Sequence, residues 1–147
     1  MAVRYFENDM NARLKDRRRL SAFLTDKVQH FLPEIKQVNL SYVFCSDDYL
    51  LEKNIAFLDH NTLTDILTFD LSEYEDELVS EIYISIDRVR ENAEKFEVSY
   101  QNELHRVIFH GMLHLCGFKD KSDAEQKEMR RQEQLCLNQY FSPVHEN

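Results

Sequence analysis

The length, composition and charge of the chain exclude several classes of protein. Its 147 residues, 43% of them hydrophobic, fit a single globular domain over residues 1–147. A formal net charge of -9 argues against a surface built for general nucleic-acid binding, so any RNA or DNA contact must be local. Three cysteines without paired spacing, no signal peptide and no run near the roughly 20 apolar residues of a membrane span favour a soluble, cytoplasmic protein.

The first half of the chain is predicted to form two strands with a helix between them. The first strand is Val3–Phe6, and the second is the alternating stretch Val38–Cys45. Apolar residues at helical spacing predict the helix between them, which Pro33 ends; they are Leu20, Leu24, Val28 and Phe31. The first turns of this helix carry a cluster of basic residues, which are Arg13, Lys15, Arg17, Arg18 and Arg19. The cluster is either a solvated helix face or a local phosphate-binding patch.

The middle of the chain is predicted to form a short helix followed by a hairpin. Ser46 or Asp47 can cap the helix, and the residues expected on its inward face are Leu51, Ile55 and Leu58. A turn is expected at residues 60–62. The two strands are Asp65–Leu71 and an alternating run through Ile82, Ile84 and Ile86. Their short connection indicates antiparallel pairing.

Three helices are predicted for the rest of the chain. The first is entered at Asp87. The second is nearly buried, is capped by Ser99 and ends at Gly117. A capping box at Ser122 starts the third, which runs to about Tyr140. We therefore predict an α+β fold in which a small mixed sheet of about four strands is packed on one side by helices.

The chain has two glycines, Gly111 and Gly117, and both lie in one short motif. Glycine costs about 1 kcal/mol relative to alanine inside a helix, so each must serve a close approach or a bend. The motif is His110-Gly-x-x-His-x-x-Gly-x-x-Asp120, with the spacing of the metzincin pattern His-Glu-x-x-His-x-x-Gly-x-x-His. The two histidines share a helix face, and the turn at Gly117 is expected to bring Asp120 back to it.

This motif predicts a zincin-like metal-binding helix that holds one Zn²⁺ ion per chain. Imidazoles from His110 and His114 and the carboxylate of Asp120 would leave a fourth position open for water. The alternative is that the two histidines are ordinary core residues. Cys116 is expected to be a small hydrophobic side chain rather than a ligand. The histidines that are not expected to be ligands are His30, His105 and His145.

The reaction class is indicated by the residue that the motif lacks. Zinc peptidases use the glutamate after the first histidine as the general base, and Gly111 cannot replace it. Its missing side chain is expected to leave room beside the metal. Hydrolysis of a phosphodiester, in which charge stabilisation carries much of the catalysis, therefore ranks before hydrolysis of a peptide. The general acid and base stay unassigned.

The motif resembles the signature of the YbeY-type endoribonucleases, H-G-x-L-H-L-x-G-[YF]-D-H. Residues His110–Phe118 follow it position by position, and Lys119-Asp120 stands where the family has Asp-His. Upstream, Thr64–Phe69 is similar to the family block P-T-D-V-L-S-F, with Leu63 at the proline position. Glu81-Ile82 looks like the start of the family's G-D-I strand.

This resemblance implies a cytoplasmic, zinc-dependent endoribonuclease that is specific for single strands. It would act in ribosomal RNA maturation and ribosome quality control. The implied metal ligands are His110, His114 and, by position, Asp120. The implied partners are single-stranded RNA, in particular ribosomal RNA, and the ribosome or its proteins. Two alternatives stay open: a metallopeptidase with an unusual metzincin-like site, and a non-catalytic ribosome assembly factor whose metal is structural.

The resemblance also shows that one family residue is missing. An arginine commonly precedes the P-T-D block as a phosphate ligand, and Leu58 stands at its position. The candidate RNA-binding residues that would take its place are Arg13, Arg17, Lys119 and Lys121.

Overall fold

The computed structural model describes residues 1–58 and 64–142, which form nine elements in the order β-α-β-α-β-β-α-α-α, as predicted. The strands are β1 (Ala2–Glu7), β2 (Gln37–Cys45), β3 (Ile66–Asp70) and β4 (Glu77–Ser85). The helices are α1 (Arg17–Phe31), α2 (Asp47–Leu58), α3 (Ile86–Lys95), α4 (Tyr100–Leu115) and α5 (Asp123–Phe141). The turn predicted at residues 60–62 lies outside the described residues.

The four strands form one mixed sheet in the order β1-β2-β4-β3. β2 runs parallel to both of its neighbours, β1 and β4. β3 and β4 form the predicted antiparallel hairpin, with Ile66 opposite Ile84 and Asp70 opposite Ser80. The mixed α+β class is thus confirmed, and β3 lies at an edge of the sheet, where its first residues border open space.

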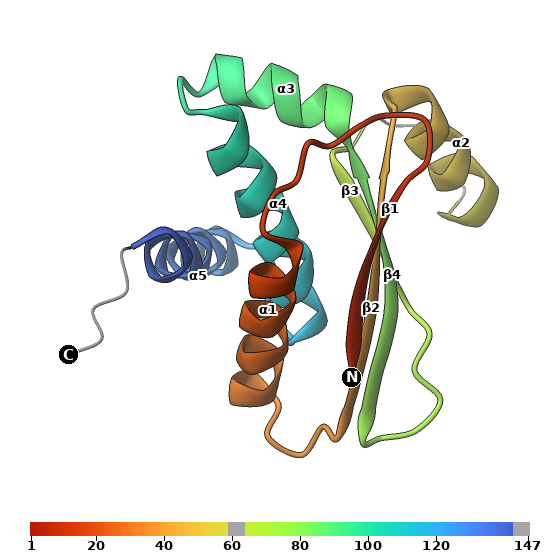
Figure 1. Ribbon diagram of the computed structural model, residues 1–147, viewed down its shortest axis with the longest axis vertical. Helices are drawn as coiled ribbons and strands as arrows, with labels where there is room; N and C mark the ends of the chain where they lie inside the picture. Colours follow the sequence, from red (N-terminus) through yellow and green to blue (C-terminus); the bar gives the residue numbers. More distant parts are fainter. Residues whose placement is uncertain (59–63, 143–147) are drawn as a thin grey trace.

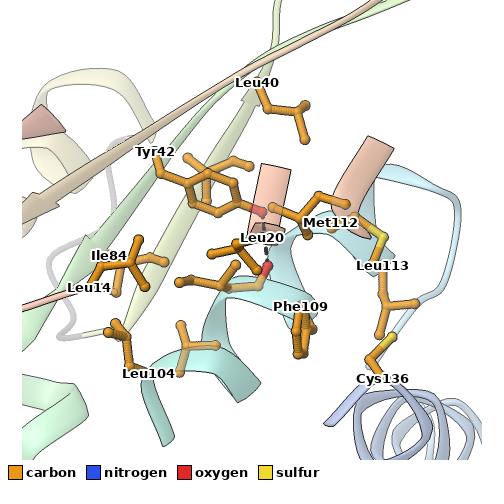
Figure 2. Close-up of a cluster of buried hydrophobic side chains, with 14 of the residues drawn as sticks. Leu14, Leu20, Leu40, Tyr42, Ile84, Leu104, Phe109, Met112, Leu113 and Cys136 are labelled. Atoms are coloured by element: carbon orange, nitrogen blue, oxygen red, sulfur yellow. Dashed lines mark hydrogen bonds between the residues drawn. The ribbon is translucent and has the colours of Figure 1, made fainter. Parts of the chain in front are cut away.

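The main core lies between the sheet and the helices α1 and α4, which cover the same face (Figure 1). Alternate residues of β2 point into it and are buried; they are Val38, Leu40, Tyr42 and Phe44. The Tyr42 hydroxyl donates a hydrogen bond to the Ile108 carbonyl of α4 at 3.0 Å. This bond is the dashed line from Tyr42 in Figure 2. Because a buried hydroxyl without a partner is costly, this bond favours one position of α4 on the sheet.

The opposite face of the sheet is partly covered by α2, so the prediction of helices on one side only was wrong (Figure 1). A small second core there contains Cys45, Leu50, Leu67 and Tyr83. The inward face predicted for α2 was also wrong, because Leu50 is buried whereas Ile55 is 46% exposed. Leu50 and Leu51 are adjacent in the first half of this helix, and contact with the sheet rather than the sequence decides which one turns inward.

The two ends of the α4–α5 connection are set by local signals that were predicted correctly. Gly117 has φ of 105°, a value that L side chains rarely adopt. The Gly117 and Phe118 amides donate to the carbonyls of His114 and Leu113, which is the Schellman arrangement. The capping box at Ser122 and Glu125 then starts α5. The residues between these signals are therefore held in a short, defined loop.

The described residues contain no helix that is both long and apolar enough to cross a membrane. All three cysteines are free: Cys45 and Cys136 are buried and Cys116 is half-buried. Burial raises the pKa of the Cys116 thiol to about 12. This protonated, partly buried side chain beside Met112 fits the small hydrophobic residue that was expected at the position.

Candidate active site

A cavity of about 280 Å³ opens between β3 and α4. Three segments line it: the start of the β3 hairpin, one stripe of α4, and the loop after α4. Their lining residues are Thr64, Asp65, Ile66 and Thr68, then Arg106, His110 and His114, and finally Asp120. The structure thus brings the three predicted metal ligands to one cavity and adds the Thr64-Asp65 pair of the upstream block.

The helical spacing of α4 explains which of its side chains reach the cavity. Arg106, His110 and His114 follow one another at intervals of four residues, so they form one stripe along the helix. His110 is half-buried and His114 is exposed near the end of the helix. The turn at Gly117 then returns the chain, and Asp120 reaches the same cavity from the loop.

The ligand candidates are close to one another but are not arranged around a metal position. Nε2 of His110 lies 3.4 Å from Oδ2 of Asp120. Within residues 1–58 and 64–142, no group of three or more His, Cys, Asp or Glu side chains is placed to hold a metal ion. The metal-binding helix and its zinc therefore stay predictions. Whether the residues of the cavity fit a metal ion depends on the chemistry of their side chains.

Glu133 of α5 fixes the orientation of His110. The His110 Nδ1–H donates to Oε2 of Glu133 at 2.6 Å, and Glu133 is only 4% exposed. With Nδ1 engaged in this way, Nε2 is the nitrogen that faces the cavity. A carboxylate behind the ring is the usual support of a metal-binding histidine, since it fixes the tautomer and makes the other nitrogen more basic. His110 thus fits a metal ligand.

The surroundings of His110 change its pKa in two opposing ways. Burial lowers the pKa, but the hydrogen bond to Glu133 and the negative charges of Glu133, Asp65 and Asp120 outweigh this effect. The pKa of His110 therefore lies above its ordinary value. This shift means that the surroundings stabilise a positive charge at His110, as a cluster of carboxylates does.

Arg106 lies in the wall of the cavity, held by carboxylates on three sides. Its guanidinium pairs with Glu103 at 2.7 Å and with Glu133 at 3.0 Å, and Asp65 is 3.8 Å away. Glu103 is 1% exposed, so this pair is largely shielded from water. Its positive charge is thus already compensated, and the guanidinium is fixed in place rather than free to move.

The balance of charge in this cavity favours a bound cation. The carboxylates of Asp65, Asp120, Glu103 and Glu133 face one guanidinium and two imidazoles. Such a site repels a phosphodiester unless further positive charge is added. Two imidazole nitrogens and a carboxylate oxygen suit Zn²⁺ as ligands. The residues present therefore fit a divalent metal ion.

Gly111 has a structural role that differs from the predicted one, which was to leave room beside the metal. A Cβ at this position would lie 2.9 Å from Cδ1 of Ile66 and 3.1 Å from Cγ2 of Ile82. The absent side chain therefore does not leave room beside a metal, as was expected, because β3 and β4 occupy that space. The glycine lets α4 approach the sheet, and a glutamate at this position would be directed against the strands.

The residues predicted to bind phosphate do not line the cavity. Arg17 pairs with Glu7 at 3.6 Å and Arg13 precedes α1, so both belong to the start of that helix. Lys119 and Lys121 are exposed and flank Asp120 in the loop. Their contribution to RNA binding stays a prediction. The side chain of Leu58, at the family arginine position, is outside the described part of the structure.

Three residues of the site were missed from the sequence, although two of them leave a signal. Arg106 lies four residues before His110 and hence on the ligand face of α4. Glu133 interrupts the buried stripe of α5 that Met129, Leu137 and Tyr140 form. A charged residue inside an apolar stripe indicates a buried, paired charge. Asp65 was noted only as part of a motif, and nothing in its spacing placed it near the histidines.

The chain is similar to known proteins over most of its length. Residues 5–141 match the family model described as Endoribonuclease YbeY. A curated Endoribonuclease YbeY from Cytophaga hutchinsonii is 42% identical over 134 residues, which cover 91% of this chain and 92% of that protein. The protein of the same name from Amoebophilus asiaticus is 38% identical over 135 residues, which cover 92% of this chain and 90% of that protein.

A shorter and more similar match is the Endoribonuclease YbeY of Flavobacterium psychrophilum, with 55% identity over 94 residues. That alignment covers 64% of this chain and 66% of the relative. Among solved structures, the solution structure of a Thermotoga maritima protein matches with a TM-score of 0.60 and 28% identity. The match covers 95% of this chain and 89% of that one, so the similarity extends over nearly the whole chain.

Proposed function

The chain belongs to the YbeY endoribonuclease family, and from that premise we propose that it is a zinc-dependent endoribonuclease that cleaves single-stranded RNA. The observation that carries the proposal is the meeting of His110, His114 and Asp120 in one cavity, with Glu133 behind His110. Ribosomal RNA, in maturation and ribosome quality control in the cytoplasm, is the substrate that we propose on the basis of the family.

The residues that would hold the metal are His110, His114 and Asp120. When bound, zinc supplies positive charge for the phosphodiester oxygens and lowers the pKa of a water molecule for attack. Glu133 keeps Nε2 of His110 directed into the cavity and balances the charge that the site acquires. The lining carboxylates then face a cation rather than repelling the substrate.

Two further lining residues have positions that suit the reaction. The carboxylate of Asp65 makes no hydrogen bond within the described residues and lies 3.8 Å from Arg106. It is therefore free to accept a proton from the attacking water, and we assign it as the general base. Arg106 is fixed by Glu103 and Glu133 and presents a guanidinium at the same wall, where it can orient a phosphate.

The size of the cavity is in keeping with an unpaired strand. About 280 Å³ lies just below the roughly 300 Å³ at which pockets for small ligands begin. A recess of this size admits one nucleotide unit, and a single strand can present one because its nucleotides are free to turn out. A double helix holds its backbone and bases in fixed positions, so the same recess excludes it.

The proposal is tested by the substrates that the zinc-loaded protein cuts. We expect cleavage of a single-stranded RNA, little cleavage of the same sequence in a duplex, and no cleavage of an unfolded protein substrate. His114→Ala should abolish the activity while the fold is kept, because His114 is exposed at the end of α4. The matched control is His30→Ala, which removes another exposed histidine, on α1.

The two rival functions give different results in the same experiment. A metallopeptidase would cut the protein substrate and leave the RNA intact. A non-catalytic assembly factor with a structural metal would cut neither, and chelation would lower its melting temperature without any activity to lose. Full RNA cleavage by His114→Ala would contradict the assignment of the site to this cavity.

A further inference from the structure

A second hollow adjoins the first cavity and is bordered by the same His110–Asp120 pair. It has a volume of about 250 Å³ and shares three lining residues with the first cavity, namely Arg106, His110 and Asp120. Its remaining walls come from α5 and are formed by Gln126, Met129, Arg130 and Glu133. The pair of His110 and Asp120, 3.4 Å apart, thus borders both recesses.

Among the described residues, Arg130 is the cation of this second hollow that has no ion-pair partner. Arg106 is already held by Glu103 and Glu133, and Glu133 in turn accepts from His110. Arg130 is exposed and forms no ion pair with any residue in 1–58 or 64–142. An exposed guanidinium with free donors, in a protein of net charge -9, is suited to bind a phosphate group.

The other side chains of the hollow match the remaining parts of a nucleotide. Gln126 has a side-chain amide that is not hydrogen-bonded to any described residue, so it can bind a ribose hydroxyl or a base edge. Met129 is 2% exposed and provides an apolar floor with a polarisable sulfur. The first cavity, in contrast, is walled by the strand residues Ile66 and Thr68.

We propose that the hollow between α4 and α5 is a subsite for the nucleotide next to the scissile phosphate, with Arg130 as its phosphate-binding residue. A strand whose scissile phosphate lies at the His110–Asp120 pair has one nucleotide on each side of that phosphate, and the pair borders two recesses that are available for them. The subsite rests on the proposed endoribonuclease function.

The matched control for Arg130 is its neighbour Arg131. Arg131 is on the same helix and has the same charge, but its guanidinium is paired with Glu128 at 2.8 Å and it does not line the hollow. Arg130→Gln and Arg131→Gln therefore change the net charge equally. Only the first removes a cation from the subsite, and neither touches a proposed metal ligand.

The experiment measures binding of the zinc-loaded protein to short single-stranded 2′-O-methyl RNA oligonucleotides by fluorescence anisotropy. We expect Arg130→Gln to weaken binding about tenfold and to reduce the salt slope of log K by about 0.7, as for one phosphate contact. Arg131→Gln should stay within about twofold of the wild type, since paired surface charges contribute little.

A scan with neutral methylphosphonate linkages locates the contact. In the wild type and in Arg131→Gln, we expect one linkage beside the cleavage site to be the most sensitive. In Arg130→Gln the same linkage should become insensitive, because its partner is absent. Equal binding by the two variants, or a scan that Arg130→Gln leaves unchanged, would overturn the subsite. If the wild type neither binds nor cuts RNA, the endoribonuclease proposal itself fails; if it does both, only the subsite is at stake.

Discussion

Glu133 on α5 accepts a hydrogen bond of 2.6 Å from Nδ1 of His110 on α4, and this bond joins the last helix of the chain to the candidate catalytic motif. The same carboxylate group binds Arg106 at 3.0 Å. The final helix is therefore part of the site rather than only a cover for it. Its contribution is to set which nitrogen of His110 faces the cavity.

Replacing Glu133 tests this role directly. We expect Glu133→Gln to lower zinc affinity and RNA cleavage by about 10-fold to 100-fold, as loss of a carboxylate behind a metal-binding histidine does. The amide keeps the shape of the side chain but not its charge, and Arg106 retains Glu103. The measurements are zinc affinity by competition with a chromophoric chelator and the rate of RNA cleavage.

The control for that change is Glu128→Gln, which removes an exposed carboxylate on the same helix that pairs with Arg131. It should leave both quantities unchanged. Equal zinc affinity in Glu133→Gln and the wild type would show that Glu133 serves only the fold.

Asp65 is expected to act in the reaction without holding the metal. Asp65→Asn should lower kcat by about 100-fold or more, because a positioned general base contributes at least that much. KM and zinc content should change little, since the three ligand candidates are untouched. Single-turnover cleavage and metal analysis of the same sample separate the two effects. Loss of zinc from Asp65→Asn would instead identify this residue as a ligand.

Gly111 is expected to be required for the packing of α4 on the sheet. Gly111→Ala places a methyl group 2.9 Å from Cδ1 of Ile66, while alanine also favours the helix by about 1 kcal/mol. Overpacking of a core costs about 1 to 3 kcal/mol, so we expect a net loss of about 1 kcal/mol in the free energy of unfolding.

Ile66→Val removes the Cδ1 methyl group that a Cβ at position 111 would contact, and it provides the matched test. It should destabilise the wild type but be neutral or stabilising in the Gly111→Ala background, as measured by urea unfolding. Additive effects of the two substitutions would mean that α4 and β3 do not meet closely at this point.

His105 should make the stability of the fold depend on pH. The ring is 3% exposed, its Nδ1–H donates to the Gln101 carbonyl at 2.7 Å, and it stacks on Tyr140. Burial lowers the pKa of His105, and the Gln101 carbonyl reverses only part of this shift. The unfolded chain therefore takes up a proton more readily than the folded one, so stability falls as the pH drops from the ordinary value of 6.5 toward the lowered pKa.

The measurement is the free energy of unfolding between pH 8 and pH 5, for protein from which a chelator has removed any metal. His105→Phe keeps an aromatic ring but cannot be protonated, so its loss of stability at low pH should be smaller than in the wild type. His110 has the opposite shift and is present in both proteins, so it cancels in the comparison. A parallel pH dependence in His105→Phe and the wild type would contradict the assignment.

The sequence was most informative where structure is set locally. The stop at Gly117 and the capping box at Ser122 were predicted because each depends on backbone conformation and hydrogen bonds within a few residues. The strand β2 was likewise predicted, because its buried and less buried residues alternate with period two. The β3–β4 hairpin was predicted because a short connection joins two strand-like stretches. These signals placed the two histidines and Asp120 at one site before any tertiary contact was known.

The rest could not be predicted because it depends on contacts between distant segments. The pairs of Glu133 with His110 and with Arg106 join α5 to α4, and only packing brings these residues together. The contact of Gly111 with Ile66 and Ile82 depends on how closely α4 approaches the sheet. Leu50 and Leu51 are adjacent and equally apolar, so the inward face of α2 was decided by the strands beneath it.

The most direct test of the account is a zinc titration of the RNA cleavage rate, starting from protein that has been freed of metal. We predict that cleavage rises with added zinc, reaches its maximum at one equivalent per chain, and stays absent throughout in Asp120→Ala and His114→Ala. Full cleavage by the metal-free wild type, or zinc-dependent cleavage by either variant at the wild-type rate, would contradict a zinc site formed by His110, His114 and Asp120.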